Sequence, residues 1–201
     1  MDSDVGIADQ HFARTRAMVK IQEGCDQVCA YCIVPKVRGR ERSVPPDAMV
    51  RQVEERLSQG FKEVVLTGTQ LGTYGFELGD TNLATLVRRI LNETAVERLR
   101  VSSLQPQEIS GELLGLWSDP RLCPHFHMPL QSGSDLVLSR MRRRYAGREY
   151  SDAVGMVRDA VQGASVTTDI IVGFPGEGEA EFAETYSLAE EVGFAATHVF
   201  P

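Results

Sequence analysis

Apolar residues are distributed along this chain in two alternating patterns, short continuous runs and amphipathic stretches. The runs predict six strands: AMVKIQ (17–22), FKEVVLTG (61–68), LRVSS (99–103), HFHMPL (125–130), SVTTDIIVGF (165–174) and FAATHVF (194–200). Between the runs, apolar residues recur every three or four positions, as a helix with one buried face requires. Helices are therefore expected at residues 45–60, 83–91, 109–117, 134–143, 148–162 and 179–192.

The alternation of strands and helices predicts the fold class. Strands with nearly continuous apolar cores, such as DIIVGF, are typical of a parallel sheet covered by helices. Right-handed crossovers would curl six such units into a barrel that stays open, because a complete eight-fold barrel needs roughly 250 residues. We expect an α/β fold, a partial (β/α)6 TIM-like barrel, formed by residues 17–201. Residues 1–16 are expected to be an N-terminal extension or linker.

Composition places this fold in a soluble, reducing setting. An apolar content of 42% is sufficient for a sizeable core. The first twenty residues mix charges and lack the apolar segment of a secretory signal, and no stretch is long enough to span a membrane. We therefore expect a cytoplasmic protein with no membrane partner, in which clustered cysteines bind metal more often than they form disulfides.

Two clusters of basic residues stand out against a net charge of −7. The negative total argues weakly against nucleic-acid binding, but exposed charges are screened beyond about 8 Å, so local clusters decide. The first cluster contains Lys36, Arg38, Arg40 and Arg42, and the second contains Arg140, Arg142, Arg143, Arg144 and Arg148. Arg38, Arg40, Arg142, Arg143 and Arg144 are the candidate RNA contacts. For either cluster taken alone, a solvated charged surface is the favoured interpretation.

Polar loops rich in small residues follow five of the predicted strands. They are the cysteine loop, TGTQLGTYG, SSLQP, QSGSD and GFPGEGE. Each glycine run alone is explained by a tight turn. In a parallel barrel, however, these loops share one rim, where such folds carry their chemistry. Five of them indicate one large site for a ligand with many hydrogen-bonding groups.

Three of the four cysteines lie within nine residues, in GCDQVCAYC (24–32). Cys25, Cys29 and Cys32 can anchor three irons of a [4Fe–4S] cluster and leave the fourth iron open. A structural zinc ion needs four ligands in a closed tetrahedron, and the remaining Cys123 is distant in sequence. A redox dithiol would leave Cys25 unexplained. The open cluster is favoured, with zinc and the dithiol as alternatives.

Several long stretches resemble the radical S-adenosylmethionine (SAM) methylthiotransferases. They are KIQEGCDQVCAYCIVPKVRGRERS, KEVVLTGTQLGTYG, HFHMPLQSGSDLVLSRMRRRY and TTDIIVGFPGEGEAEFAETY. The KIQEGCD and LTG-x-x-LG-x-YG stretches are most similar to the branch that acts on N6-threonylcarbamoyladenosine 37 of tRNA. The resemblance runs from Ala17 to the end. The family also has a second-cluster domain and an RNA-binding barrel, so we expect this sequence to be its central domain. Tyr145-Ala146 stands where the family often has Tyr-Thr.

The resemblance implies a cofactor set and a reaction. A [4Fe–4S] cluster on Cys25, Cys29 and Cys32 would bind SAM and cleave it reductively to a 5′-deoxyadenosyl radical. A methylthio group would then be added to adenosine C2 in the tRNA anticodon loop, with electrons from a flavodoxin or ferredoxin. A ribosomal-protein substrate, or a non-catalytic iron–sulfur or zinc module, is the alternative. The implied cofactor-binding residues are Tyr31, Gly68, Thr69, Ser102, Ser103, Asp169 and Gly173.

Polar residues also occur inside two of the predicted strands. Asp169 interrupts the apolar run TTDIIVG, which is costly unless the carboxylate is paired or functional. A SAM contact and a partnered carboxylate in the barrel interior are equally favoured. His125 and His127 are assigned to opposite faces of the fourth strand, and each is expected to be structural and not part of a metal pair.

Overall fold

The structure, a computed structural model, describes residues 15–201, and six parallel strands form its centre. They are β1 (Arg16–Lys20), β4 (Glu63–Thr67), β5 (Arg98–Val101), β6 (His125–His127), β7 (Ser165–Ile171) and β8 (Ala196–Phe200). Two parallel ladders, β1-β4-β5 and β6-β7-β8, are joined by isolated bridges from Leu99 to Leu122 and from Ser103 to His127. The predicted partial (β/α)6 barrel is confirmed. Most of the expected N-terminal extension lies outside the described residues.

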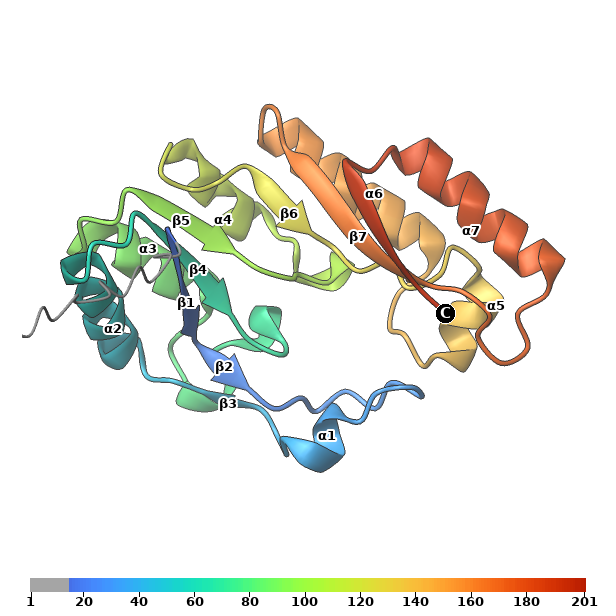
Figure 1. Ribbon diagram of the computed structural model, residues 1–201, viewed down its shortest axis with the longest axis horizontal. Helices are drawn as coiled ribbons and strands as arrows, with labels where there is room; N and C mark the ends of the chain where they lie inside the picture. Colours follow the sequence, from blue (N-terminus) through green and yellow to red (C-terminus); the bar gives the residue numbers. More distant parts are fainter. Residues whose placement is uncertain (1–14) are drawn as a thin grey trace, which may run out of the picture.

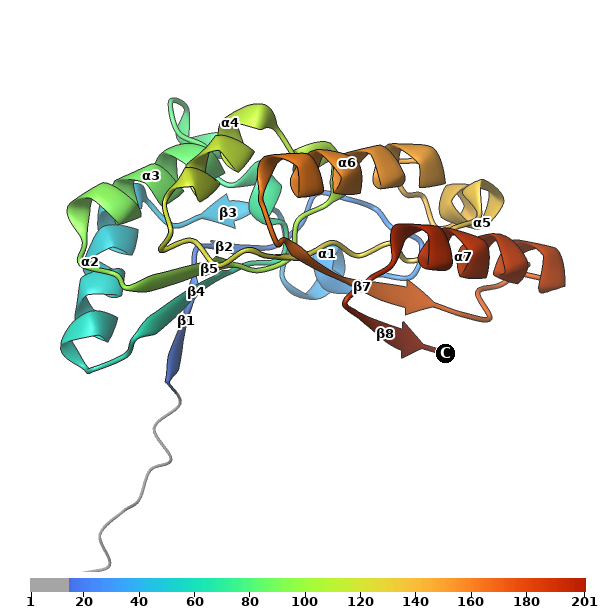
Figure 2. The ribbon, with the colours of Figure 1, turned by 90° about the horizontal axis from the view of Figure 1, so that it is seen from above.

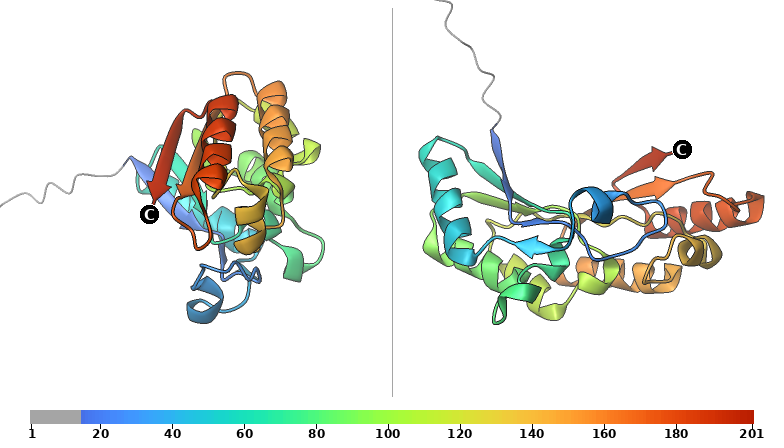
Figure 3. Two further views of the ribbon diagram at one scale, coloured as in Figure 1. Left: turned by 90° about the vertical axis from the view of Figure 1, so that its right-hand side faces the viewer. Right: turned by 90° about the horizontal axis from the view of Figure 1, so that it is seen from below.

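Helices cover the convex face of this curved sheet, and the concave face is open (Figures 1 and 2). They are α2 (Pro46–Ser58), α3 (Leu83–Glu93), α4 (Gly111–Leu114), α5 (Asp135–Arg140), α6 (Gly147–Ala160) and α7 (Glu179–Val192). The short α1 (Val34–Val37) lies instead on the open side, in the segment after the cysteines. Short 3-10 turns lie at Leu71–Thr73, Phe76–Leu78, Pro106–Glu108 and Gly115–Ser118. Figure 3 shows β1 and β8 at the two free edges of the open barrel.

The core lies between the sheet and its helices. Met49 and Val53 of α2 and Leu86 and Ile90 of α3 are fully buried with the apolar face of β4 and β5. Burial on this scale stabilises by about 25 cal/mol per Å² of apolar surface removed from water. Strand β7 instead alternates, with its even-numbered residues buried. Its other residues face the concave side, which leaves room there for polar chemistry.

Two local features differ from the sequence expectation. The helix expected at 109–117 is divided into α4 and a 3-10 turn, since Gly111 and Gly115 lower helix propensity in so short a segment. A small antiparallel pair, β2 (Gln22–Glu23) with β3 (Arg42–Ser43), closes the base of the cysteine loop. In the part of the chain that the structure describes, no helix has the length and apolar character needed to cross a membrane.

Candidate active site

Backbone hydrogen bonds hold the cysteine loop at the rim where the strands end. Its first turn places Gly24 at a positive φ of 78°, and the Cys25 amide donates to the Gly39 carbonyl at 3.2 Å. The Ala30 amide donates to the carbonyl of Met141, just after α5, at 3.0 Å. The loop is thus tied to both halves of the barrel. Cys25 is buried, Cys29 and Cys32 are half-buried, and none of them forms a disulfide.

The three cysteines open into one cavity of about 200 Å³. Its wall also contains Gln27, Tyr31, Thr69, Gln70, Leu71, Ser103, Gln105, Glu108, Pro129, Gln131 and Arg143. The loops after β4, β5 and β6 therefore converge on the cysteines, as the rim argument predicts. The loop after β7 contributes Phe174, whose ring meets that of Tyr31 edge-on with centroids 6.4 Å apart. The ring of Tyr31 is thereby fixed beside the cavity.

The structure separates the predicted SAM contacts into two groups. Tyr31, Thr69 and Ser103 line the cavity, whereas Gly68, Ser102 and Gly173 lie behind or beside it. A Cβ at Gly68 would come within 2.8 Å of the Leu71 side chain and 3.1 Å of the Gln22 carbonyl, so this glycine permits close packing. Gly173 is exposed with a positive φ of 73°, in a turn whose amide donates to Glu177.

Asp169 does not line the cavity, and two histidines hold its carboxylate. Nε2 of His127 and Nδ1 of His198 each lie 3.1 Å from one of its oxygens. Of the two interpretations of Asp169, the partnered interior carboxylate is the one that matches its surroundings. The assignment of His125 and His127 to opposite faces is wrong, because residues two apart in a strand point to the same side. Both rings approach Thr167 Oγ1, at 3.3 and 3.0 Å.

Arg143 belongs to the cysteine cavity and not to an exposed basic surface. Its guanidinium donates to Cys29 Sγ at 3.5 Å, to Tyr31 Oη at 3.4 Å and to Tyr145 Oη at 3.1 Å. These contacts do not fit the interpretation of Arg143 as an RNA contact. The other candidate arginines are exposed; Arg40 forms an ion pair with Asp26 at 3.0 Å. In the sequence, Arg143 is one member of a basic cluster and cannot be told apart from Arg142 and Arg144. Only the fold shows that Arg143 lines the cavity while the other two are exposed.

A network of glutamines with Glu108 forms the floor of the cavity, and the sequence reasoning missed it. Gln22 Oε1 accepts from the amides of Thr69 and Gln70, both at 3.0 Å. Gln105 donates to Gln70 Oε1 at 2.5 Å, and Gln70 donates to Glu108. Burial raises the pKa of Glu108 to about 7. The only sequence signal was QPQE (105–108), which follows the serines of the third strand after one leucine.

Burial raises the pKa of both a thiol and a phenol group of the cavity. Burial raises the pKa of the Cys25 thiol, with the Glu41 carboxylate contributing in the same sense. It also raises the pKa of Tyr31 to about 12, so this hydroxyl stays protonated. A buried thiol gives up its proton readily only to a nearby cation or metal. The cavity therefore suits a metal centre better than a free thiolate nucleophile.

The residues present fit an iron–sulfur cube better than a single zinc ion. Among the described residues, the three cysteines do not form a group whose ligand atoms converge on one ion. A structural zinc ion requires such convergence and a fourth ligand. The cube presents separate iron corners, so its thiolates need not converge. Thr69 Oγ1 and Arg143 Nη2 are buried without a hydrogen-bond partner, which leaves a donor and a hydroxyl available to a bound molecule.

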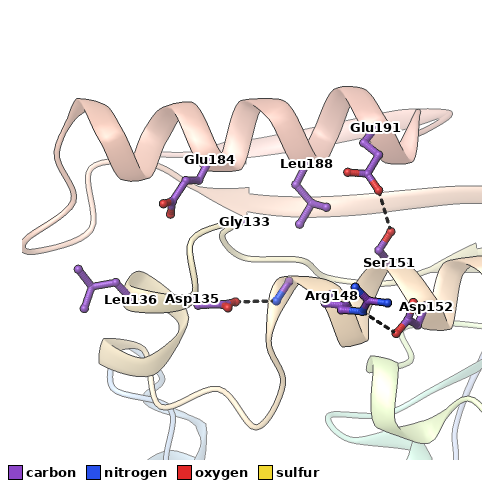
Figure 4. Close-up of a pocket in the computed structure, with 10 residues that line it drawn as sticks. Gly133, Asp135, Leu136, Arg148, Ser151, Asp152, Glu184, Leu188 and Glu191 are labelled. Atoms are coloured by element: carbon purple, nitrogen blue, oxygen red, sulfur yellow. Dashed lines mark hydrogen bonds and ion pairs between the residues drawn. The ribbon is translucent and has the colours of Figure 1, made fainter.

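A larger depression of about 590 Å³ lies between α5, α6 and α7, away from the cysteines (Figure 4). Several of its polar side chains have partners within the fold. Asp135 accepts from the Gly147 amide at 2.8 Å, and Ser151 lies 3.4 Å from Glu191. Glu149 accepts from the Ala146 amide at 2.7 Å, which provides a cap where the expected threonine is missing. The contacts of Asp135 and Glu149 secure the start of α6, and that of Ser151 joins α6 to α7, so the depression is structural.

The fold and the site define a class: a parallel half-barrel that gathers three cysteines and several polar loops at the carboxyl ends of its strands. Residues 19–189 match the Radical SAM superfamily, and the chain belongs to it. The radical SAM methyltransferase TsrM from Kitasatospora setae has the same fold, with a TM-score of 0.74 at 17% identity over 92% of this chain and 35% of that one. Coproporphyrinogen III oxidase from Escherichia coli gives 0.62 at 18% identity, covering 92% and 43%.

Sequence relatives are more specific. The chain is 42% identical to the threonylcarbamoyladenosine tRNA methylthiotransferase MtaB of Bacillus subtilis, over 94% of this chain and 42% of the relative. It is 44% identical to the tRNA-2-methylthio-N(6)-dimethylallyladenosine synthase of Geobacter sulfurreducens, over 88% and 40%. The chain thus spans less than half the length of these relatives.

Proposed function

We propose that this chain is the radical SAM core of a tRNA methylthiotransferase that modifies C2 of N6-threonylcarbamoyladenosine 37. The observation that carries the proposal is the convergence of Cys25, Cys29 and Cys32 with three polar rim loops on one cavity. Relatives that share 42–44% identity with nearly the whole chain are named as tRNA methylthio-group enzymes. The KIQEGCD and LTG-x-x-LG-x-YG stretches favour the threonylcarbamoyl branch.

Seven residues of the cavity have a role in this proposal. Cys25, Cys29 and Cys32 would hold a [4Fe–4S] cluster with one open iron. When bound, such a cluster would supply the single electron, received from a flavodoxin or ferredoxin, for the reductive cleavage of SAM. Thr69, Ser103 and the unpartnered Nη2 of Arg143 would bind the polar groups of SAM, and Tyr31 would lie beside its adenine.

The exposed arginines support an RNA substrate. The Ala30–Met141 hydrogen bond brings Arg142 and Arg144 next to the cysteine loop, which Arg38 directly follows. Both basic clusters therefore flank one rim, although they lie far apart in sequence. A basic rim around the cavity suits an anticodon loop better than a ribosomal protein. Such a substrate also agrees with a cytoplasmic location.

The test of the cluster is anaerobic reconstitution with iron and sulfide. We expect one [4Fe–4S] cluster per chain, measured by iron and sulfide content and by absorbance. Replacing any one of Cys25, Cys29 and Cys32 by alanine should abolish the cluster. Cys123→Ala is the matched control and should retain it. Stoichiometric zinc without sulfide, in protein kept from oxygen, contradicts the proposal.

The test of the RNA surface is the salt dependence of anticodon-stem-loop binding. The combined change Arg38→Gln, Arg142→Gln and Arg144→Gln should reduce the slope of log K against log salt by roughly two units, at about 0.7 per lost contact. Arg51→Gln, an exposed arginine on α2, is the control and should leave the slope unchanged. An equal slope for the triple variant would return these arginines to the solvated-surface interpretation.

A further inference from the structure

Three neighbouring strands bring metal-ligating side chains together on the concave face, although His127 is paired in register with Thr167, two residues before Asp169. His127 lies on β6, Asp169 on β7 and His198 on β8, and Asp169 is the register partner of His198. The Asp169 carboxylate is 3.1 Å from His127 Nε2 and 3.1 Å from His198 Nδ1, through its two different oxygens. One ligand atom from each residue lies within 4.8 Å of the others.

These distances suit a single ion. Bonds of about 2.0–2.1 Å to a tetrahedral ion separate its ligand atoms by roughly 3.4 Å. The two imidazole–carboxylate distances are already close to this value, so only small side-chain rotations are needed. The set of two nitrogens and one oxygen without sulfur is chemically distinct from the cysteine site. The carboxylate also offsets half of the charge of a divalent ion.

Thr167 orients the innermost ligand. Its Oγ1 lies 3.0 Å from Nδ1 of His127, the ring nitrogen that does not face Asp169. When Nδ1–H donates to this hydroxyl, Nε2 carries the free lone pair and points toward Asp169. Metal-binding histidines usually make such a second hydrogen bond, which fixes their tautomer. His125, on the same strand face, contacts Thr167 but not Asp169.

The three side chains are buried to different degrees, so the site is open to solvent on one side. The side chains of His127 and Asp169 are 17% and 25% exposed, whereas that of His198 is 64% exposed. Water can therefore complete the shell from the open side of the barrel. All five residues of β8 are exposed, so this edge strand has little apolar burial of its own. An ion bound by His198 would attach β8 to β6 and β7.

We propose that His127, Asp169 and His198 form a binding site for a divalent transition-metal ion such as Zn²⁺ or Ni²⁺, with water as a further ligand. The site stabilises the free edge of the barrel. It borders the cysteine cavity, because Ser103, in the wall of that cavity, is the bridge partner of His127. The inference does not rest on the proposed function, since none of its ligands is a cysteine.

Nickel binding tests the site. The untagged 201-residue chain carrying Cys25→Ala, Cys29→Ala and Cys32→Ala, which removes competing thiols, is dialysed to equilibrium against Ni²⁺ and analysed for bound metal. We expect one nickel per chain and a melting temperature that rises with nickel concentration. His127→Gln and His198→Gln should each weaken binding by at least about tenfold, and Thr167→Val by about tenfold. The chain with intact cysteines and a reconstituted cluster should show the same differences between variants.

His125→Gln is the matched control, and it should bind nickel as the parent does. Because His198 is exposed on an edge strand, its replacement leaves the fold intact, which the melting temperature without metal verifies. Equal nickel affinity for the parent and His198→Gln, or no bound nickel at about 1 mM free metal, would overturn the site. Either result leaves cluster assembly at the cysteines unaffected, so the failure of one proposal is distinguishable from that of the other.

Discussion

Glu108 shows how strongly the cavity alters a single side chain. It lies among glutamines in the cavity wall, with the Gln105 amide donating to Oε2 at 2.9 Å and Gln70 donating to Oε1. Burial nevertheless dominates and raises the pKa of its carboxyl to about 7. Near neutral pH, Glu108 can therefore hold or release a proton beside the cysteines.

We predict that this carboxyl makes the chain less stable as pH rises. The folded state binds the proton more tightly than the unfolded state, whose value is about 4.5. The free energy of unfolding should therefore fall between about pH 4.5 and 7 and level off above. Glu108→Gln should reduce the difference between pH 5 and pH 8 by on the order of 1–3 kcal/mol, measured by urea denaturation of the cluster-free chain. Glu54→Gln, exposed on α2, should not reduce it.

Arg143 is the charged group that contacts the cysteine loop from the opposite half of the barrel. A charge-assisted hydrogen bond to a thiolate is worth about 1–3 kcal/mol, which corresponds to roughly tenfold or more in a rate or equilibrium. We predict that Arg143→Leu speeds the loss of iron to a chelator by about tenfold after reconstitution. Arg144→Leu, an exposed neighbour, should lose iron at the parent rate. Equal rates for the two variants would limit Arg143 to a packing role.

At the scale of the element, the cysteine loop depends on one turn. Gly24 has φ of 78°, and a Cβ there would lie 2.0 Å from the Arg40 carbonyl oxygen. Gly39 has a similar φ of 73°, but its Cβ would meet nothing within 4 Å. The two glycines therefore share the conformational cost of substitution, about 1–2 kcal/mol, and differ only in the clash.

This pair gives a matched prediction. Gly24→Ala should displace the loop and prevent stable cluster assembly, because the clashing atom is backbone and cannot rotate away. Gly39→Ala should retain the cluster with only a small loss of stability. Iron and sulfide content after reconstitution measures both, and circular dichroism checks that the barrel remains folded. Full cluster content in Gly24→Ala would show that the loop tolerates a different turn.

The elements were predictable from sequence where periodicity and burial agree. The six strands and the helices α2, α3, α6 and α7 follow apolar patterns that tertiary packing reinforces. The convergence of Cys25, Thr69 and Ser103 followed from parallel topology alone, since loops after parallel strands share a rim.

What could not be predicted depends on contacts between distant segments. The sequence does not reveal that Arg143 turns toward Cys29, more than a hundred positions away, while Arg142 and Arg144 stay exposed. The glutamine network is equally invisible, since isolated polar residues in loops are usually solvated. The error over His125 and His127 was one of strand geometry, and it concealed the grouping of His127 with Asp169 and His198.

At the scale of the whole molecule, the proposed reaction has two steps, cleavage of SAM and transfer of sulfur, and this barrel provides the residues for the first step only. Cleaving SAM needs a cluster with a vacant iron, an electron and a cavity that holds SAM, and residues 25–143 provide the cavity. As the resemblance to the methylthiotransferases implies, sulfur transfer would need a second cluster on three further cysteines. Within these 201 residues only Cys123 remains, and it is buried under the other end of the sheet.

We therefore predict that the reconstituted 201-residue chain, given SAM and a strong reductant, forms 5′-deoxyadenosine without methylthiolating tRNA. We expect 5′-deoxyadenosine to form slowly. The open concave face admits water, so cleavage of SAM is not coupled to reaction with the tRNA. Liquid chromatography measures both products in one sample, and Cys29→Ala should abolish the deoxyadenosine whereas Cys123→Ala should not. Methylthiolated adenosine from these residues alone would contradict the need for a second cluster. No cleavage by a fully reconstituted sample would contradict the proposed SAM chemistry itself, since the cavity, the cluster and the electron would then all be present.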